Sequence, residues 1–132
     1  MTQEEKDLLL KDLCARLPYS IMCNHYNRNE IIANISDKGF YQPMSRDGWH
    51  IIEEIKPYLR PMSSMTEEEY NKYELTFDNV VVYSGHNNNN IYSEHRPTYE
   101  TFDYLDSIHV DYRDLIPKGL ALPAPEGMYN IK

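Results

Sequence analysis

Two prolines near the middle of the chain, Pro57 and Pro61, constrain the fold more than any other local feature. Each proline fixes its backbone φ angle and lacks the amide hydrogen that a helix or a sheet ladder needs. Arg60, which precedes the second proline, is also biased toward extended geometry. We therefore expect residues 57–65 to form a stiff extended connector, with residues 58–60 in neither a helix interior nor a central strand. A proline-flanked recognition segment is the alternative interpretation.

Helix-start signals follow this connector and recur at the N-terminus. Thr66–Glu69 and Thr2–Glu5 both fit the capping box, in which the threonine side chain and the glutamate side chain each satisfy a free backbone amide. Three consecutive glutamates follow Thr66 in the first turn, where negative charge interacts favourably with the helix dipole. We expect the first helix to reach residues 16–17 and the second to reach residues 73–75.

The first helix has an amphipathic pattern. Its apolar residues fall on one side, which we expect to face the core, and its charged residues fall on the other, which we expect to face solvent. The apolar side comprises Leu9, Leu10, Leu13, Cys14 and Leu17, and the charged side comprises Glu5, Asp12 and Arg16.

Residues 19–52 have the composition of short strands separated by turns. In the second of these strands, Ile31, Ala33 and Ile35 alternate and are expected to share a face. We expect a four-stranded antiparallel meander, with closure into a small barrel as an alternative. The predicted strands are residues 20–26, 30–35, 40–42 and 49–52.

Aromatic residues are abundant in this region: Tyr19, Tyr26, Tyr41 and Trp49. Such side chains stack on bases, contact sugars or form protein interfaces. They also pack in and around small sheets, which is the interpretation we favour here.

The second half of the chain predicts a strand at residues 80–83, an exposed, mobile Asn-rich loop at about residues 84–95 and a helix at residues 98–109. Phe102, Tyr104, Leu105 and Ile108 form the apolar arc of that helix, and Glu100, Asp103 and Asp106 form a solvated arc. Asp111 is expected to cap a short turn, with Gly119 as a left-handed exit and residues 120–125 as an extended tail.

Charge divides the chain at the same place as the prolines. The net charge is −8, of which residues 1–65 carry −1 and residues 66–132 carry −7. An acidic half repels phosphate backbones, so we expect no general nucleic-acid binding. Acidity of this kind suits a basic partner or simply maintains solubility.

Length and composition fit one compact unit. No apolar run is long enough to span a bilayer and the first residues are acidic, so we expect a cytoplasmic protein that lacks a signal peptide and a membrane partner. Cys14 and Cys23 are too few for a disulfide framework and are expected to be buried thiols.

Residues that could carry chemistry are sparse. No nucleotide-binding, nucleophile-elbow or HExxH motif is present. His86, Glu94 and His95 match no compact zinc spacing, and we expect no metal and no cofactor. His50 with Glu53 and Glu54, and Cys23 with His25, are the only clusters that suit catalysis. We predict that the protein is not an enzyme, and assign no catalytic or ligand-binding residue.

Several blocks of the sequence resemble a family of small uncharacterised proteins from gut anaerobic bacteria and their phages and mobile elements. The blocks are residues 1–19, 56–69, 102–105, 111–122 and 124–129, about half of the chain. The resemblance implies an accessory protein of phage or mobile-element type and transfers no catalytic residues. The resembling sequences have Trp where Tyr104 stands and Gly where Asp114 stands.

The sequence therefore predicts an α+β fold. Residues 1–56 form a helix packed on the meander, residues 57–65 the connector, and residues 66–132 an acidic, mainly helical half. We expect a non-enzymatic protein that acts by contact with a protein partner. The alternatives are a small-ligand or nucleotide-binding module, which would need a pocket lined by Tyr and by Arg28, Arg46 or Arg60, and a hydrolase that uses His50 or Cys23 and His25.

Overall fold

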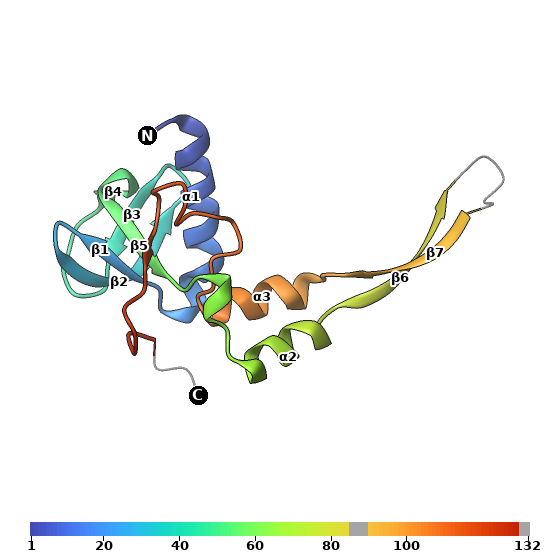
Figure 1. The fold of residues 1–132 in the computed structure, drawn as a ribbon. Coiled ribbons are helices and arrows are strands. Elements are labelled where there is room, and N and C mark those ends of the chain that lie inside the picture. The colour runs from blue at the N-terminus through green and yellow to red at the C-terminus, as the bar shows by residue number, and fades with distance from the viewer. Residues whose placement is uncertain (85–89, 130–132) are drawn as a thin grey trace.

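The computed structural model describes residues 1–84 and 90–129 (Figure 1). The central part of the predicted Asn-rich loop, residues 85–89, lies outside the described residues. The last part of that predicted loop, residues 90–95, is instead a strand.

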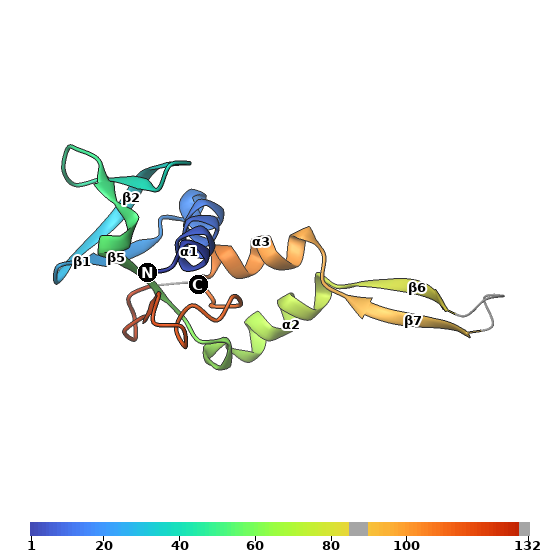
Figure 2. The ribbon, with the colours of Figure 1, turned by 90° about the horizontal axis from the view of Figure 1, so that it is seen from above.

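The chain is arranged as a body and an arm. The body comprises residues 1–65 and 108–129 and contains one long helix packed on a mixed sheet. The arm comprises residues 66–107 and projects from the body in both views (Figures 1 and 2).

The helix of the body, α1 (Gln3–Arg16), begins with the predicted capping box. Thr2 Oγ1 accepts a hydrogen bond from the backbone amide of Glu5, and the Glu5 carboxylate accepts one from the amide of Thr2. Leu9 and Leu13 are fully buried against the sheet. Each buried leucine stabilises the fold by about 1.5–3 kcal/mol.

The prediction that the charged side of α1 faces solvent is wrong. Asp12 and Arg16 are fully buried, whereas Cys14 is exposed. The reason is that a distant part of the chain covers this side of the helix and supplies polar partners to both charges. Those partners are Arg113 and the backbone of Val110.

The sheet has six strands in the order β4-β3-β2-β1-β5-β8. Strands β1 to β4 pair antiparallel with their sequence neighbours, β5 pairs antiparallel with β1, and β8 pairs parallel with β5. The sheet is open, so the alternative of a closed barrel is wrong. The strands are β1 (Met22–His25), β2 (Arg28–Ser36), β3 (Phe40–Pro43), β4 (His50–Ile51), β5 (Ile55–Leu59) and β8 (Leu122–Pro123).

The expectation that the proline-flanked stretch avoids a central strand is also wrong. Pro57 lies in β5, between β1 and β8. Because β8 pairs only with Tyr58 and Leu59, the strand has a single neighbour at Pro57, which is where a sheet tolerates proline. Arg60, directly after β5, forms an isolated parallel bridge with Val110.

The prediction that Ile31 and Ala33 lie on the buried face of β2 is wrong. Glu30 and Ile32 point into the body, and Ile31 and Ala33 are only partly buried. An irregularity in the pairing with β3, between Ile32 and Asn34, then shifts the register. A bulge of this kind reverses the alternation of faces along a strand, so a simple pattern of every second residue fails here.

The arm consists of α2 (Glu67–Leu75), β6 (Asp78–Ser84), β7 (Asn90–Arg96) and α3 (Tyr99–Ser107). Helix α2 starts at the predicted Thr66 capping box. Strands β6 and β7 form a separate two-stranded antiparallel sheet at the far end of the arm. The expectation of a mainly helical second half is therefore wrong, because this part of the chain contributes three strands among the described residues.

A second apolar cluster fixes the base of the arm to the body. Leu105 on α3 is buried with Ile108 and Val110, and Met65 and Tyr73 pack against them. The Asp111 carboxylate accepts hydrogen bonds from the amides of Leu115 and Ile116, which confirms its predicted capping role, and Gly119 has the predicted positive φ of 74°. Short 3₁₀ turns occupy Leu17–Tyr19, Ile52–Glu54 and Met62–Ser64.

Candidate functional site

The ribbon of β6 and β7 exposes apolar side chains on both of its faces. Residues directly opposite each other in the ladder share a face. Val81 pairs with Ser93, and Val82 pairs with Tyr92. Val81 is 55% exposed, Ile91 61% and Tyr92 47%, so none of these apolar side chains is covered within the described chain.

Exposed apolar residues continue along the helices at the root of the ribbon. Leu75 at the end of α2 is 83% exposed, and Tyr99 at the start of α3 is 95% exposed. Phe102 follows one turn later on α3 and is also exposed. Aromatic side chains of this kind supply much of the binding energy at protein interfaces.

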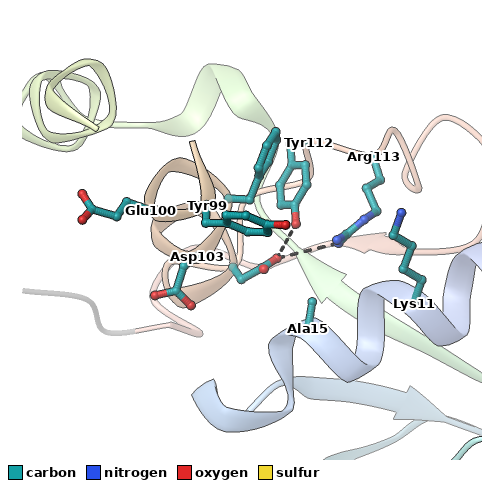
Figure 3. Close-up of a pocket in the computed structure, with 9 residues that line it drawn as sticks. Lys11, Ala15, Tyr99, Glu100, Asp103, Tyr112 and Arg113 are labelled. Carbon is teal, nitrogen blue, oxygen red and sulfur yellow. Dashed lines mark hydrogen bonds and ion pairs between the residues drawn. The ribbon is translucent and has the colours of Figure 1, made fainter. Parts of the chain in front are cut away.

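A groove opens beside Phe102, between α1 and α3 (Figure 3). It has a volume of about 870 Å³, and apolar surface predominates in its lining. Lys11 and Ala15 of α1 form one wall in Figure 3. The remaining lining residues are Tyr99, Glu100, Phe102, Asp103, Asp106, Tyr112 and Arg113.

The floor of this groove is held by hydrogen bonds and ion pairs. The Tyr112 hydroxyl donates to Asp106 at 2.8 Å, and the Arg113 guanidinium lies over the Tyr112 ring, 4.4 Å from its centroid. Asp106 is buried, which corrects the expectation of a solvated carboxylate. Burial raises the pKa of this carboxyl above its ordinary value, because the charged form loses hydration.

Beneath the floor, a charged pair lies inside the protein. Arg16 Nε donates to both oxygens of Asp12, at 3.1 and 3.0 Å, and Arg113 Nη1 donates to Asp12 Oδ1 at 2.7 Å. Arg16 Nη2 lies 3.9 Å from Asp106. Two cations thus share two buried carboxylates, which makes the groove floor a rigid, electrically compensated platform.

The arginines proposed for a ligand pocket do not converge. Arg28 is exposed at the end of the β1–β2 hairpin. Arg46 is bound to Glu30. Arg60 lines a second cavity of about 730 Å³, but both of its terminal nitrogens donate to Glu69 at 2.7 Å. The guanidinium groups of Arg46 and Arg60 are therefore already paired with carboxylates.

Only some of the residues that the sequence suggested for catalysis lie close together in the structure. His25, His50 and Glu54 are neighbours, with Glu54 accepting from His25 Nε2 at 3.0 Å. Glu53 points elsewhere and pairs with Lys6. Cys23 is buried, and desolvation raises the pKa of its thiol well above the ordinary value, which disfavours a nucleophilic thiolate.

The three residues considered for a metal site in the second half are not assembled among the described residues. His86 lies outside them. Glu94 pairs with Arg96, and His95 contacts Asn79 and stacks on the ring of Phe77. Glu94 and His95 are adjacent in β7, so their side chains point to opposite faces of the ribbon.

Of the aromatic residues in the first half, Tyr41 is buried in the core, whereas Tyr26 and Trp49 are exposed. Sequence patterns missed the groove, because it joins α1 to residues about a hundred positions away. Two aromatic residues one turn apart at the start of α3, Tyr99 and Phe102, were the signal in the sequence that could have indicated it.

Comparison with protein families, curated proteins and solved structures gives no significant match to this chain. No helix within the described residues combines the length and the apolar character that crossing a bilayer requires.

Proposed function

We propose that this protein is a non-enzymatic binding protein whose arm engages a partner protein with a basic surface. The observation that carries the proposal is the uncovered ribbon of β6 and β7. An accessory role of phage or mobile-element type stays a prediction that rests on the sequence resemblance.

An isolated two-stranded ribbon is marginally stable in water. This ribbon has no third strand and no helix packed on either face within the described chain. Its exposed Val81, Ile91 and Tyr92 make it an unusual surface for a protein that acts alone. A partner that covers these side chains would remove apolar area from water and stabilise the ribbon at the same time.

The charge of the arm indicates the chemistry of the partner. Residues 66–107 contain nine acidic and two basic side chains, a net charge of −7 out of −8 for the whole chain. An acidic surface attracts a basic one and speeds their encounter. The same charge disfavours a second copy as the partner, because two such arms would repel each other.

The groove at the root of the arm extends the same surface. Tyr99 and Phe102 line it, and both side chains are exposed. Acidic groups outnumber basic ones in its lining, which disfavours a phosphate-bearing nucleotide and favours an apolar, basic segment of a protein. The small-ligand alternative therefore has less support, and the hydrolase alternative is disfavoured by burial of Cys23, which raises the pKa of its thiol.

The test is affinity capture from cells that naturally express the gene, with the intact chain and with Val81→Asp/Ile91→Asp as bait. A basic protein should bind the intact chain and be lost by at least tenfold with the ribbon variant. Binding should also weaken as salt is raised from about 50 to 300 mM, because long-range attraction is screened.

A matched pair of charge variants separates the arm from the body. Neutralising Glu74, Asp78 and Glu100 on the arm should reduce capture. The control neutralises Asp7, Asp37 and Asp47, which are exposed on the body, and changes the net charge equally. Capture that falls equally with both sets, or that persists with the ribbon variant, would overturn the proposal. So would a captured species that is only a second copy of this chain.

A further inference from the structure

Three metal-ligating side chains meet in the body, far from the arm. His25 lies at the end of β1, His50 in β4 and Glu54 at the end of the 3₁₀ turn that follows β4. One potential ligand atom from each lies within 4.8 Å of the other two. His50 and Glu54 are four residues apart, but His25 precedes them by about 25 residues, which is why spacing alone did not bring the three together.

Two features of the cluster point to a ligand. The Nε2 of His50 is buried and has no hydrogen-bond partner among the described residues. The hydroxyl of Tyr41, a fully buried residue, also lacks a hydrogen-bond partner within the described chain. The centroids of the Tyr41 and His50 rings are 5.5 Å apart. Buried polar atoms without partners are costly, and they commonly indicate a missing ion or water.

The hydrogen bonds fix the tautomer of His25. Arg46 Nη2 lies 2.6 Å from His25 Nδ1 and can only donate, so Nδ1 is the acceptor. The proton of the neutral ring is then on Nε2, which donates to Glu54. This proton occupies the position at which a metal would bind.

We infer that His25 Nε2, an imidazole nitrogen of His50 and the Glu54 carboxylate bind a divalent transition metal ion of the zinc class. Two imidazoles and one carboxylate form a donor set that suits such ions and leaves a further position open. The metal takes the place of the proton that His25 shares with Glu54, and the neutral ring then carries its single proton on Nδ1 instead.

Glu30 lies near the ring nitrogen of His25 that does not bind the metal. Its Oε2 is 4.0 Å from His25 Nδ1, and the residue is almost fully buried. When Nε2 binds metal, Nδ1 carries the proton and needs an acceptor, which a nearby carboxylate supplies in most histidine sites. Glu30 is therefore a positioning residue.

Arg46 opposes binding. Its charge lies against the ring, and it blocks the approach of Glu30 to Nδ1. It belongs to the loop between β3 and β4, and its side chain is partly exposed, so it can turn toward solvent. Tetrahedral bonds of about 2.1 Å place ligand atoms about 3.4 Å apart. His25 Nε2 and Glu54 Oε2 are already 3.0 Å apart, so the remaining adjustment, from at most 4.8 Å, is within reach of side-chain rotation.

The test titrates the full chain, without a histidine tag, with Co²⁺ and follows the visible absorption of tetrahedral cobalt, then displaces the cobalt with Zn²⁺. The expected result is one equivalent bound. Glu54→Gln and His50→Ala should abolish the absorption, and Glu30→Gln should weaken binding by about 10- to 100-fold. Arg46→Gln should strengthen it.

Glu53→Gln and His95→Ala are the matched controls and should bind cobalt as the unmodified chain does. Circular dichroism of each variant in EDTA verifies that it is folded. Absence of stoichiometric binding by the folded, unmodified chain would overturn the inference. Binding that survives both Glu54→Gln and His50→Ala would do the same.

Discussion

Arg16 donates a hydrogen bond to the carbonyl oxygen of Val110 at 2.6 Å, although 94 residues separate the two. The same guanidinium is held by Asp12 on its own helix. This contact joins α1 to the segment that follows the arm, and it fixes the base of the arm relative to the body.

Replacement of Asp12 by Asn should destabilise the protein strongly. The change keeps the shape of the side chain but removes the nearer of the two buried carboxylates that Arg16 and Arg113 share, so that Asp106 alone faces both cations. Breaking a buried ion pair from one side costs about 3–5 kcal/mol. Urea denaturation measures the difference in the free energy of unfolding.

Asp7 provides the control for this change, because it lies on the exposed side of the same helix. Asp7→Asn should alter the free energy of unfolding by no more than about 0.5 kcal/mol. A loss below about 1 kcal/mol for Asp12→Asn would show that the buried pair contributes little.

Glu69 should make stability depend on pH in the acid range. Its bonds with Arg60 lower the pKa of the carboxyl from its ordinary value of 4.5 to about 2. The unfolded chain therefore binds this proton more readily, and the stabilisation is complete above pH 4.5 and disappears as the pH falls toward about 2. The difference in unfolding free energy between the unmodified chain and Glu69→Gln should shrink across that window. A constant difference from pH 6 to 2.5 would contradict the assignment.

His109 should add a second dependence at higher pH. Burial, with the nearby Arg16 cation, lowers the pKa of this imidazole from its ordinary value of 6.5 to about 4. The unfolded state takes up the proton first, so stability falls as the pH drops from 6.5 to about 4. His109→Asn suits the positive φ of 60° and removes the titrating group. The variant should lose the slope in that window, as followed by thermal unfolding; an unchanged slope would exclude His109 as its source.

The ribbon of β6 and β7 should exchange its amide hydrogens faster than the body sheet in the isolated protein. Among the described residues, each of its strands has one neighbour and its side chains have few buried contacts, so local opening requires little free energy. Hydrogen exchange followed by mass spectrometry should show ribbon amides exchanging at least tenfold faster than those of β1 and β2. Equal protection would mean that something else already covers the ribbon.

Local sequence signals predicted the element boundaries well where their partners are close in sequence. The capping boxes at Thr2 and Thr66 and the Asp111 cap are all satisfied within five residues. Such signals need no knowledge of the rest of the fold. They therefore hold whatever the tertiary arrangement is.

The failures occur where a partner is remote. Asp12, Arg16 and Asp106 read as solvated charges because their counter-charges lie on other elements. His50 and Glu54 are near each other in sequence, whereas His25 is remote from both. His25 reaches Glu54 because β1 pairs with β5, where His25 lies opposite Ile55, and it reaches His50 through the sheet order β1-β2-β3-β4. Strand β7 was missed because its polar residues lack alternation, and β6 alone supplies its partner.

The most direct test of the arm as a binding surface is site-specific photo-cross-linking in the cells that express the gene. One chain carries the photoreactive amino acid at Ser93, opposite Val81 on the ribbon, and the other carries it at Asp37, in an exposed turn of the body. We predict that Ser93 cross-links to one basic protein and that Asp37 does not. Absence of a cross-link from Ser93, or the same products from both positions, would contradict the proposal.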